Sequence, residues 1–277
     1  MGVADDFKKW TNSAGLGLLT RTSGFDKASG AVVADFKNDN PLKAHADYKA
    51  TKAGDVAAAA RLVQALVKPE SIEAAKKVFG DDVIYVPVHT EEASGRNNIP
   101  NALAMHYSAK IGVEVDITIT QANRVFHTGA NAMERLLARA EFAGDIEHGR
   151  RYVLVDDVTT MGSTLADLAS HIRSHGGEVA GLVVLVNAMR GGTMALASKT
   201  IKELEARHGD EISKLFGIEP GALTASEAQY LIGFRATDEL RNRVAKAAQE
   251  RIARLHAKEL LPERQDPSGG VTASRAS

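Results

Sequence analysis

The chain's 277 residues can bury one sizeable hydrophobic core, and its 34 Lys and Arg against 35 Asp and Glu give a net charge of −1, so no overall positive charge indicates a nucleic-acid partner. The absence of cysteine excludes disulfides and thiolate metal sites. Because the first ten residues lack the apolar segment of a signal peptide and no apolar run approaches the ~18 residues that span a bilayer, we expect a cytoplasmic globular protein without membrane association.

The first eighty residues mix extended and helical patterns. Apolar runs at 16–21 and 31–36 predict two strands joined by a polar stretch that contains glycine. Apolar residues at helical spacing then predict a helix over 55–66, and a shorter helix follows over 71–79. We expect residues 1–80 to form an N-terminal hood and helical region beside the core.

Residues 81–190 alternate between the patterns of buried strands and helices. Strands that are separated by helices predict a parallel sheet with right-handed crossovers. We therefore expect an α/β fold in which a central parallel sheet, flanked by helices, has its core in 81–190. The predicted strands are 83–88, 113–119, 152–156 and 179–188, and the predicted helices cover 101–110 and the stripe Leu165, Leu168, Ala169 and Ile172.

The chain beyond Arg190 has a helical character. The clearest helix is predicted over 238–260, with Thr237 as its N-cap. The segment 191–261 is expected to be a C-terminal helical extension, and 262–277 a disordered tail. Basic residues recur through the last helix, and this pattern indicates either a solvated helix face or an interaction module.

The sequence RYVLVDDVTTMGSTL at 151–165 carries the main chemical signal. An apolar strand runs into the adjacent carboxylates of Asp156 and Asp157, and a small-residue loop leads into a helix near Ser163. In open α/β sheets ligands bind at the carboxyl ends of strands, and backbone N–H groups that enter a helix attract an anion. The loop therefore suits a terminal phosphate. The acid pair suits sugar hydroxyls or a divalent cation, and the alternative is that it only caps the helix.

This segment resembles the phosphoribosyl-diphosphate (PRPP) binding motif of the type I phosphoribosyltransferases, and the similarity extends over roughly 80–190. The resemblance implies that Asp156 and Asp157 hold the ribose 2′- and 3′-hydroxyls and face the cofactor Mg²⁺. It also implies a PRPP partner and is compatible with a homodimer. The loop residues that it assigns to the 5′-phosphate are Thr159, Thr160, Met161, Gly162, Ser163 and Thr164.

Two loop residues depart from the family pattern. Met161 stands where the family usually has Thr or Ala, so one hydroxyl is missing. Thr160 occupies the position at which members that act on 6-oxopurines carry an acidic base. The resemblance therefore argues against a hypoxanthine or guanine acceptor and leaves orotate-like, adenine-like and unusual acceptors open.

Two further loops are candidates for the diphosphate end of PRPP. The loop after the strand 83–88 contains His89 and Arg96, and its GRNN segment partly resembles ComF-type members of the superfamily. A solvated role for Arg96 is equally compatible with its position. The segment 120–150 corresponds to the family's mobile loop, in which Arg124 and His127 are candidate catalytic residues. Arg135 and Arg139 follow at helical spacing and are expected on a solvated face.

The sequence thus predicts a Mg²⁺-dependent phosphoribosyltransferase that uses PRPP, releases diphosphate and transfers to a small-molecule acceptor base that the residues do not identify. Asp156, Asp157, Arg124 and His127 are its predicted catalytic residues. The alternative is a non-catalytic PRPP or nucleotide sensor with a helical interaction module. The acceptor pocket is expected either from 1–80, with Phe36 or Tyr48 stacking on a base, or from the helices after Arg190.

Overall fold

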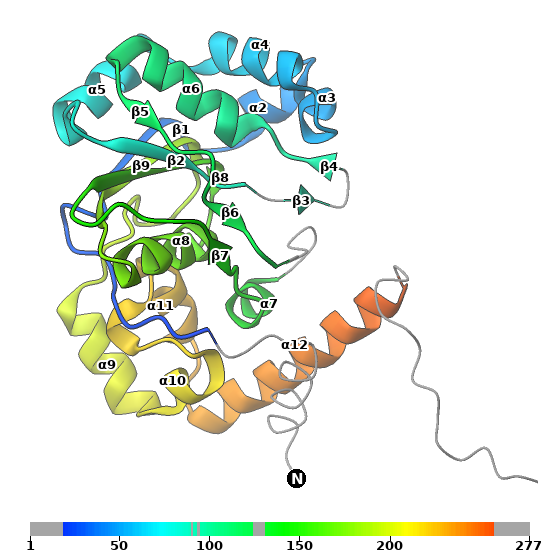
Figure 1. Ribbon diagram of the computed structural model, residues 1–277. Coiled ribbons are helices and arrows are strands. Elements are labelled where there is room, and N and C mark those ends of the chain that lie inside the picture. Colours follow the sequence, from blue (N-terminus) through cyan, green and yellow to red (C-terminus); the bar gives the residue numbers. More distant parts are fainter. Residues whose placement is uncertain (1–18, 90, 93–94, 124–130, 258–277) are drawn as a thin grey trace, which may run out of the picture.

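The computed structural model describes residues 19–89, 91–92, 95–123 and 131–257. Its centre is a five-stranded parallel sheet (Figure 1). The predicted α/β fold with a parallel sheet flanked by helices is therefore confirmed. In spatial order the strands are β1 (Val32–Phe36), β9 (Glu178–Asn187), β8 (Arg151–Thr159), β2 (Ile84–Pro87) and β5 (Glu114–Val115).

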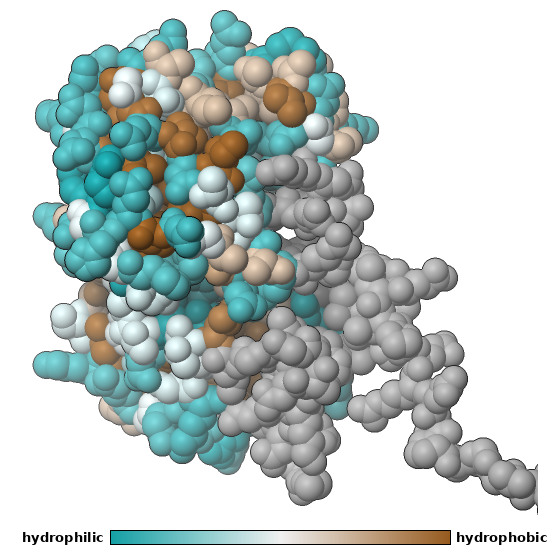
Figure 2. Space-filling model, in the orientation of Figure 1, coloured by the Kyte–Doolittle hydropathy of each residue, from teal (hydrophilic) through white to brown (hydrophobic). Residues whose placement is uncertain are grey.

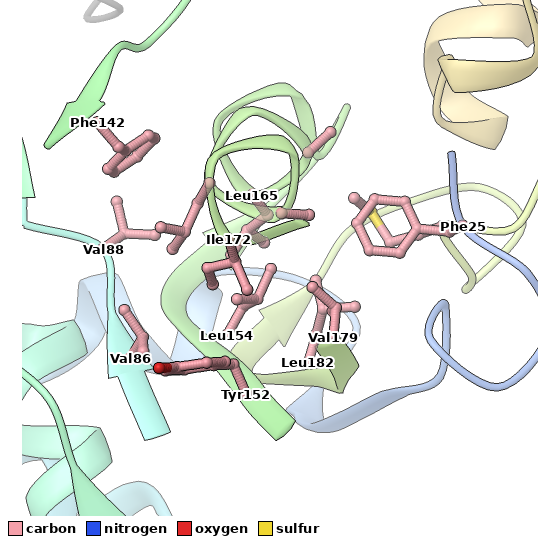
Figure 3. Close-up of a cluster of buried hydrophobic side chains, with 14 of the residues drawn as sticks. Phe25, Val86, Val88, Phe142, Tyr152, Leu154, Leu165, Ile172, Val179 and Leu182 are labelled. Atoms are coloured by element: carbon pink, nitrogen blue, oxygen red, sulfur yellow. The ribbon is translucent and has the colours of Figure 1, made fainter. Parts of the chain in front are cut away.

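Helices cover both faces of the sheet, which explains why the strands read as almost continuous apolar runs. On one face lie α4 (Val56–Leu66), α5 (Pro69–Phe79) and α6 (Ile99–Ile111), with the short helices α2 (Asn40–Ala44) and α3 (Tyr48–Lys52) beside them (Figure 1). On the other face lies α8 (Ser163–Ser174). In Figure 3, Val86, Leu154 and Leu182 of three neighbouring strands face Leu165 and Ile172 of α8.

The helix boundaries follow ordinary capping chemistry. The Asp55 side chain accepts the Ala58 N–H and begins α4. Pro69 occupies the first turn of α5, where its missing N–H leaves no helical hydrogen bond unmade. Gly112 ends α6 in the left-handed conformation, at φ 89°.

The segment between β5 and β8 is less regular than the sequence predicted. The strand expected over 113–119 is reduced to the two residues of β5. Downstream, β6 (Thr120–Gln121) pairs antiparallel with β7 (Phe142–Ala143), and α7 (Ala132–Leu137) lies between them in the chain.

The chain after β9 forms a separate helical layer below α8 (Figure 1). It has its own hydrophobic cluster, to which Met133 and Leu136 of α7 also belong. Thr237 is the first residue of the last helix and donates its hydroxyl to the Arg207 carbonyl, so it is not the N-cap that the sequence predicted. The layer comprises α9 (Ser198–His208), α10 (Glu211–Phe216), a 3-10 turn (Pro220–Ala222), α11 (Ala225–Leu231) and α12 (Thr237–Ala257).

The N-terminal strand predicted over 16–21 does not join the sheet within the described residues. Arg21 makes only an isolated bridge to Ile218, next to the C-terminal layer. On the face shown in Figure 2, hydrophobic areas are small and separated by hydrophilic surface. None of the helices in the described part of the chain combines the length and the apolar character that crossing a bilayer requires.

The strand order favours a ligand site between β2 and β8. The chain leaves β2 through α6 toward β5 at one side, whereas it leaves β8 through α8 toward β9 at the other side. Such divergent connections open a crevice at the carboxyl ends of the two neighbouring strands. The acid pair and the loop after it lie at this point.

Candidate functional site

Asp156 and Asp157 occupy successive positions of β8, so their side chains point to opposite sides of the sheet. Asp156 lines a cavity together with the following loop, 159–165. Asp157 instead lies against residues from α3 and from the loop after β2. The two acids therefore have different surroundings, although they are neighbours in the sequence.

Both carboxylate oxygens of Asp157 accept hydrogen bonds. Oδ2 accepts from Lys52 Nζ at 2.7 Å and from Asn97 Nδ2 at 2.9 Å, while Oδ1 accepts from the Val158 N–H at 2.7 Å. Burial alone would raise the pKa of Asp157, but the Lys52 ammonium and these hydrogen bonds outweigh burial and hold the pKa below its ordinary value. Asp157 is therefore an anion with a fixed cationic partner.

Asp156 has the opposite electrostatic surroundings. Burial raises the pKa of Asp156 well above its ordinary value, and the negative charge of Asp157 raises it further. One oxygen accepts the Asp157 N–H at 2.9 Å. A ligand that donates hydrogen bonds or brings positive charge to Asp156 would relieve this cost, which makes Asp156 the acid of the pair that is poised for a ligand.

The loop 159–164 leaves several polar groups open at the start of α8. No side chain caps this helix, and Gly162 precedes it with a φ of 75°. The helix-cap alternative for the acid pair is therefore wrong. The hydroxyls of Thr159 and Ser163 are buried and have no hydrogen-bond partner among the described residues. Buried hydroxyls are costly when unpaired, so two of them beside an open helix N-terminus fit an anion.

Arg135 also lines this cavity, together with Asp156 and the loop. Burial lowers the pKa of its guanidinium. Arg139, which follows the end of α7, is buried and bonds through Nη2 to Asp167 Oδ1 at 2.5 Å. The expectation that both arginines lie on a solvated face is wrong, because Arg135 lines the cavity and Arg139 bonds to Asp167 of α8 and to the carbonyls of Leu19 and Gly217.

The remaining predicted residues are placed only in part. His89 is buried just beyond the end of β2. The backbone of Arg96 lies in β4 (Gly95–Arg96), which pairs with β3 (Glu91–Glu92). The side chain of Arg96 lies outside the described residues, as do Arg124 and His127.

Two contact residues of the acid pair were missed by sequence analysis. Lys52 stands 105 positions before Asp157, and no pattern in the sequence links the two. Asn97 was noted only as part of a resembling segment, and its amide is what connects the loop after β2 to Asp157. Among the described residues, no three acidic or histidine side chains gather as a metal site. A Mg²⁺ ion at Asp156 would thus need further oxygen ligands from a bound substrate. Substrate phosphates commonly supply such oxygens to Mg²⁺.

A groove of about 920 Å³ lies next to the loop 159–164. Its walls come from Thr160 and Met161, from the loop after β9, and from α11 and the start of α12. The chain after Arg190 thus supplies most of the wall of this groove. Phe36 and Tyr48 instead pack against the core cluster between the sheet and α4–α6, which fits their ordinary core role.

Comparison with known families agrees with this geometry. Residues 102–220 match the family model of the phosphoribosyl transferase domain, and this range includes the acid pair, the loop and most of the groove wall. The chain contains a phosphoribosyl transferase domain. The family resemblance of the motif at 151–165 is confirmed.

Three relatives of the chain have different names. Protein TraN of Escherichia coli is 33% identical over 216 residues, which cover 76% of this chain and 48% of TraN. An uncharacterized protein of Haemophilus influenzae is 36% identical over 129 residues, 46% of this chain and 29% of that protein. An orotate phosphoribosyltransferase of Methanopyrus kandleri is 35% identical over 79 residues, 28% of this chain and 43% of the enzyme. The matches thus span less than half the length of each relative.

Proposed function

We propose that this protein is a phosphoribosyltransferase that takes the phosphoribosyl group from PRPP, releases diphosphate and transfers the sugar to a nitrogenous base. The observation that carries the proposal is the pair of unpartnered buried hydroxyls, Thr159 and Ser163, at the uncapped start of α8 beside Asp156. A 5′-phosphate satisfies the hydroxyls and the helix N-terminus, and the ribose hydroxyls donate to Asp156.

The two acids divide the work at the sugar. Asp156 accepts hydrogen bonds from the ribose hydroxyls, and their approach favours its ionised form. Asp157 keeps Lys52 and Asn97 in place, so that a positive charge and an amide stand on the diphosphate side of the ribose. Fixed donors on that side stabilise the charge that develops on the leaving diphosphate.

We propose that Mg²⁺ binds together with the diphosphate group of PRPP. Asp156 would hold it together with oxygens of PRPP, because the oxygens of Asp157 already accept hydrogen bonds. When bound, Mg²⁺ supplies charge neutralisation for the leaving group.

The acceptor binds in the groove beside Thr160 and Met161. The groove volume of about 920 Å³ lies in the range of small-molecule sites and exceeds the needs of one base. Tyr230 and Phe234 line it and meet edge to face, with ring centroids 5.4 Å apart.

One assay tests the proposal. The protein is incubated with PRPP, Mg²⁺ and a panel of bases that includes orotate and adenine, and diphosphate release is followed. We expect turnover with at least one base, and a loss of tenfold or more in Asp156→Asn, where the acceptor for the ribose hydroxyls is weakened. Tight PRPP binding without turnover for any base would favour the sensor. Failure to bind PRPP would contradict both functions.

A further prediction concerns Arg135. Arg135→Met is expected to raise the Kd for ribose 5-phosphate about tenfold or more, because a hydrogen bond to a charged group contributes about 1.5–3 kcal/mol. Isothermal titration calorimetry measures it. Arg150→Met is the matched control, since Arg150 stands just before β8, at the opposite end of the strand, and pairs with Glu114 and Glu147. Equal Kd values for wild type and Arg135→Met would remove Arg135 from the site.

A further inference from the structure

Met161 lies in the loop 159–164, to which we assign the 5′-phosphate and which is called the phosphate loop below. It connects this loop to the C-terminal layer. Its side chain packs against the hydrophobic cluster of that layer. On the next residue, any side chain at Gly162 would collide with Met194, whose sulfur lies 2.4 Å from the position of a Cβ. The large residue at 161, where the family usually has a small one, thus has a structural partner in this chain.

The Met161 carbonyl is held by Thr224, the N-cap residue of α11. Thr224 donates its hydroxyl to this carbonyl at 2.6 Å. In a trans peptide the C=O and the following N–H point in opposite directions. A Met161 carbonyl that points at Thr224 therefore turns the Gly162 N–H away from α11. A carbonyl turned into the phosphate cavity would repel an anion, so this orientation decides whether the loop attracts phosphate.

Thr224 is itself fixed from both sides. Its hydroxyl accepts the Glu227 N–H at 3.1 Å, and Glu227 Oε2 accepts the Thr224 N–H at 2.8 Å, which completes a capping box. Glu227 also pairs with Arg21 at 2.5 Å, and Arg21 reaches Asp167 of α8 at 3.3 Å. The side chains of all three charged residues are almost fully buried. The start of α11 is thereby tied to the first turns of α8.

We propose that Thr224 is a positioning residue of the phosphate loop, which orients the Met161–Gly162 peptide so that the Gly162 N–H faces the 5′-phosphate. This inference rests on the proposed function and adds that the C-terminal layer is part of the PRPP site. The bond from Thr224 to Met161 joins α11, which lines the acceptor groove, to the loop that binds the 5′-phosphate. The layer that receives the acceptor therefore also orients the loop that binds PRPP.

The first test compares variants at 224 by calorimetry with ribose 5-phosphate and PRPP. Thr224→Val keeps the shape and removes the hydroxyl, and we expect the Kd to rise about tenfold, whereas Thr224→Ser keeps the hydroxyl and stays within about twofold of wild type. Asp55→Ala is the matched control, because it also removes a helix N-cap but lies on α4, away from the loop. Its melting temperature should fall as in Thr224→Val, and its Kd should not change.

The second test reads the peptide directly in the wild-type protein. With 13C-carbonyl methionine and 15N-glycine, only the Met–Gly pairs 1–2 and 161–162 give correlated amide signals. Ribose 5-phosphate should shift the amide proton signal of Gly162 downfield and leave the amide signal of Gly2 unchanged. This measurement tests whether the Gly162 N–H faces the phosphate even if Thr224→Val does not fold.

The outcomes distinguish a failure of the proposed function from a failure of the positioning role of Thr224. If wild-type protein binds neither ribose 5-phosphate nor PRPP, the proposed function fails. If wild type binds but Thr224→Val binds equally well, or Asp55→Ala loses as much affinity, Thr224 has no positioning role. An unmoved Gly162 amide in the phosphate-bound protein overturns the inference as well.

Discussion

Asp167→Asn is expected to lower the free energy of unfolding by about 3–5 kcal/mol, the range found when one partner of a buried ion pair is removed. Asp167 Oδ1 accepts from Arg139 Nη2 at 2.5 Å and from Arg21 Nη1 at 3.3 Å, and Oδ2 accepts the Ala140 N–H at 3.1 Å. Asparagine would keep one acceptor and place an NH₂ group against these donors. The buried guanidinium of Arg139 would then lose the charge of its carboxylate partner, and that of Arg21 would keep its pair with Glu227.

Chemical denaturation of wild type and Asp167→Asn measures this difference. Asp210→Asn serves as the control, because Asp210 pairs with Lys214 at 2.6 Å on the surface and exposed pairs contribute little. Similar unfolding free energies for wild type and Asp167→Asn would show that the cluster is not what joins the layers. A large loss, by contrast, identifies the cluster as the link between the N-terminal segment, α8 and α11.

The motif at 151–165 could be predicted because its parts are adjacent in the chain. A strand, two acids, a loop and a helix start define their own geometry once the strand enters a parallel sheet. The opposite orientations of Asp156 and Asp157 also follow from the alternation of a strand. What the sequence could not show is which neighbours each acid meets, since Lys52 comes from a helix that is distant in the chain.

The same distinction explains the errors at Arg135 and Arg139. The predicted helical spacing does not extend to Arg139, because α7 ends at Leu137. Arg139 instead pairs with Asp167 of α8, and Arg135 lines the cavity with Asp156, and the local sequence pattern identifies neither of these neighbours. Met161 likewise read as a departure from the family pattern, and its reason is a contact with the layer that follows.

Lys52→Met is expected to lower the free energy of unfolding by about 3 kcal/mol at pH 7, since it leaves the buried carboxylate of Asp157 without its cation. The effect should depend on pH in a defined direction. In wild type the folded pKa of Asp157 is depressed, so its contribution is present above the unfolded pKa and is lost only as pH falls through the folded pKa.

In the variant, burial is no longer opposed by Lys52 and should raise the pKa of Asp157. A raised folded pKa costs stability as pH rises, so the deficit of Lys52→Met should be largest near neutral pH and shrink as pH falls toward 4. Denaturant unfolding across this range, with Lys43→Met as a control for an exposed pair with Asp39, measures it. A deficit that is constant with pH would mean that Lys52 stabilises by packing and that the charge of Asp157 is held by Asn97 and the backbone alone.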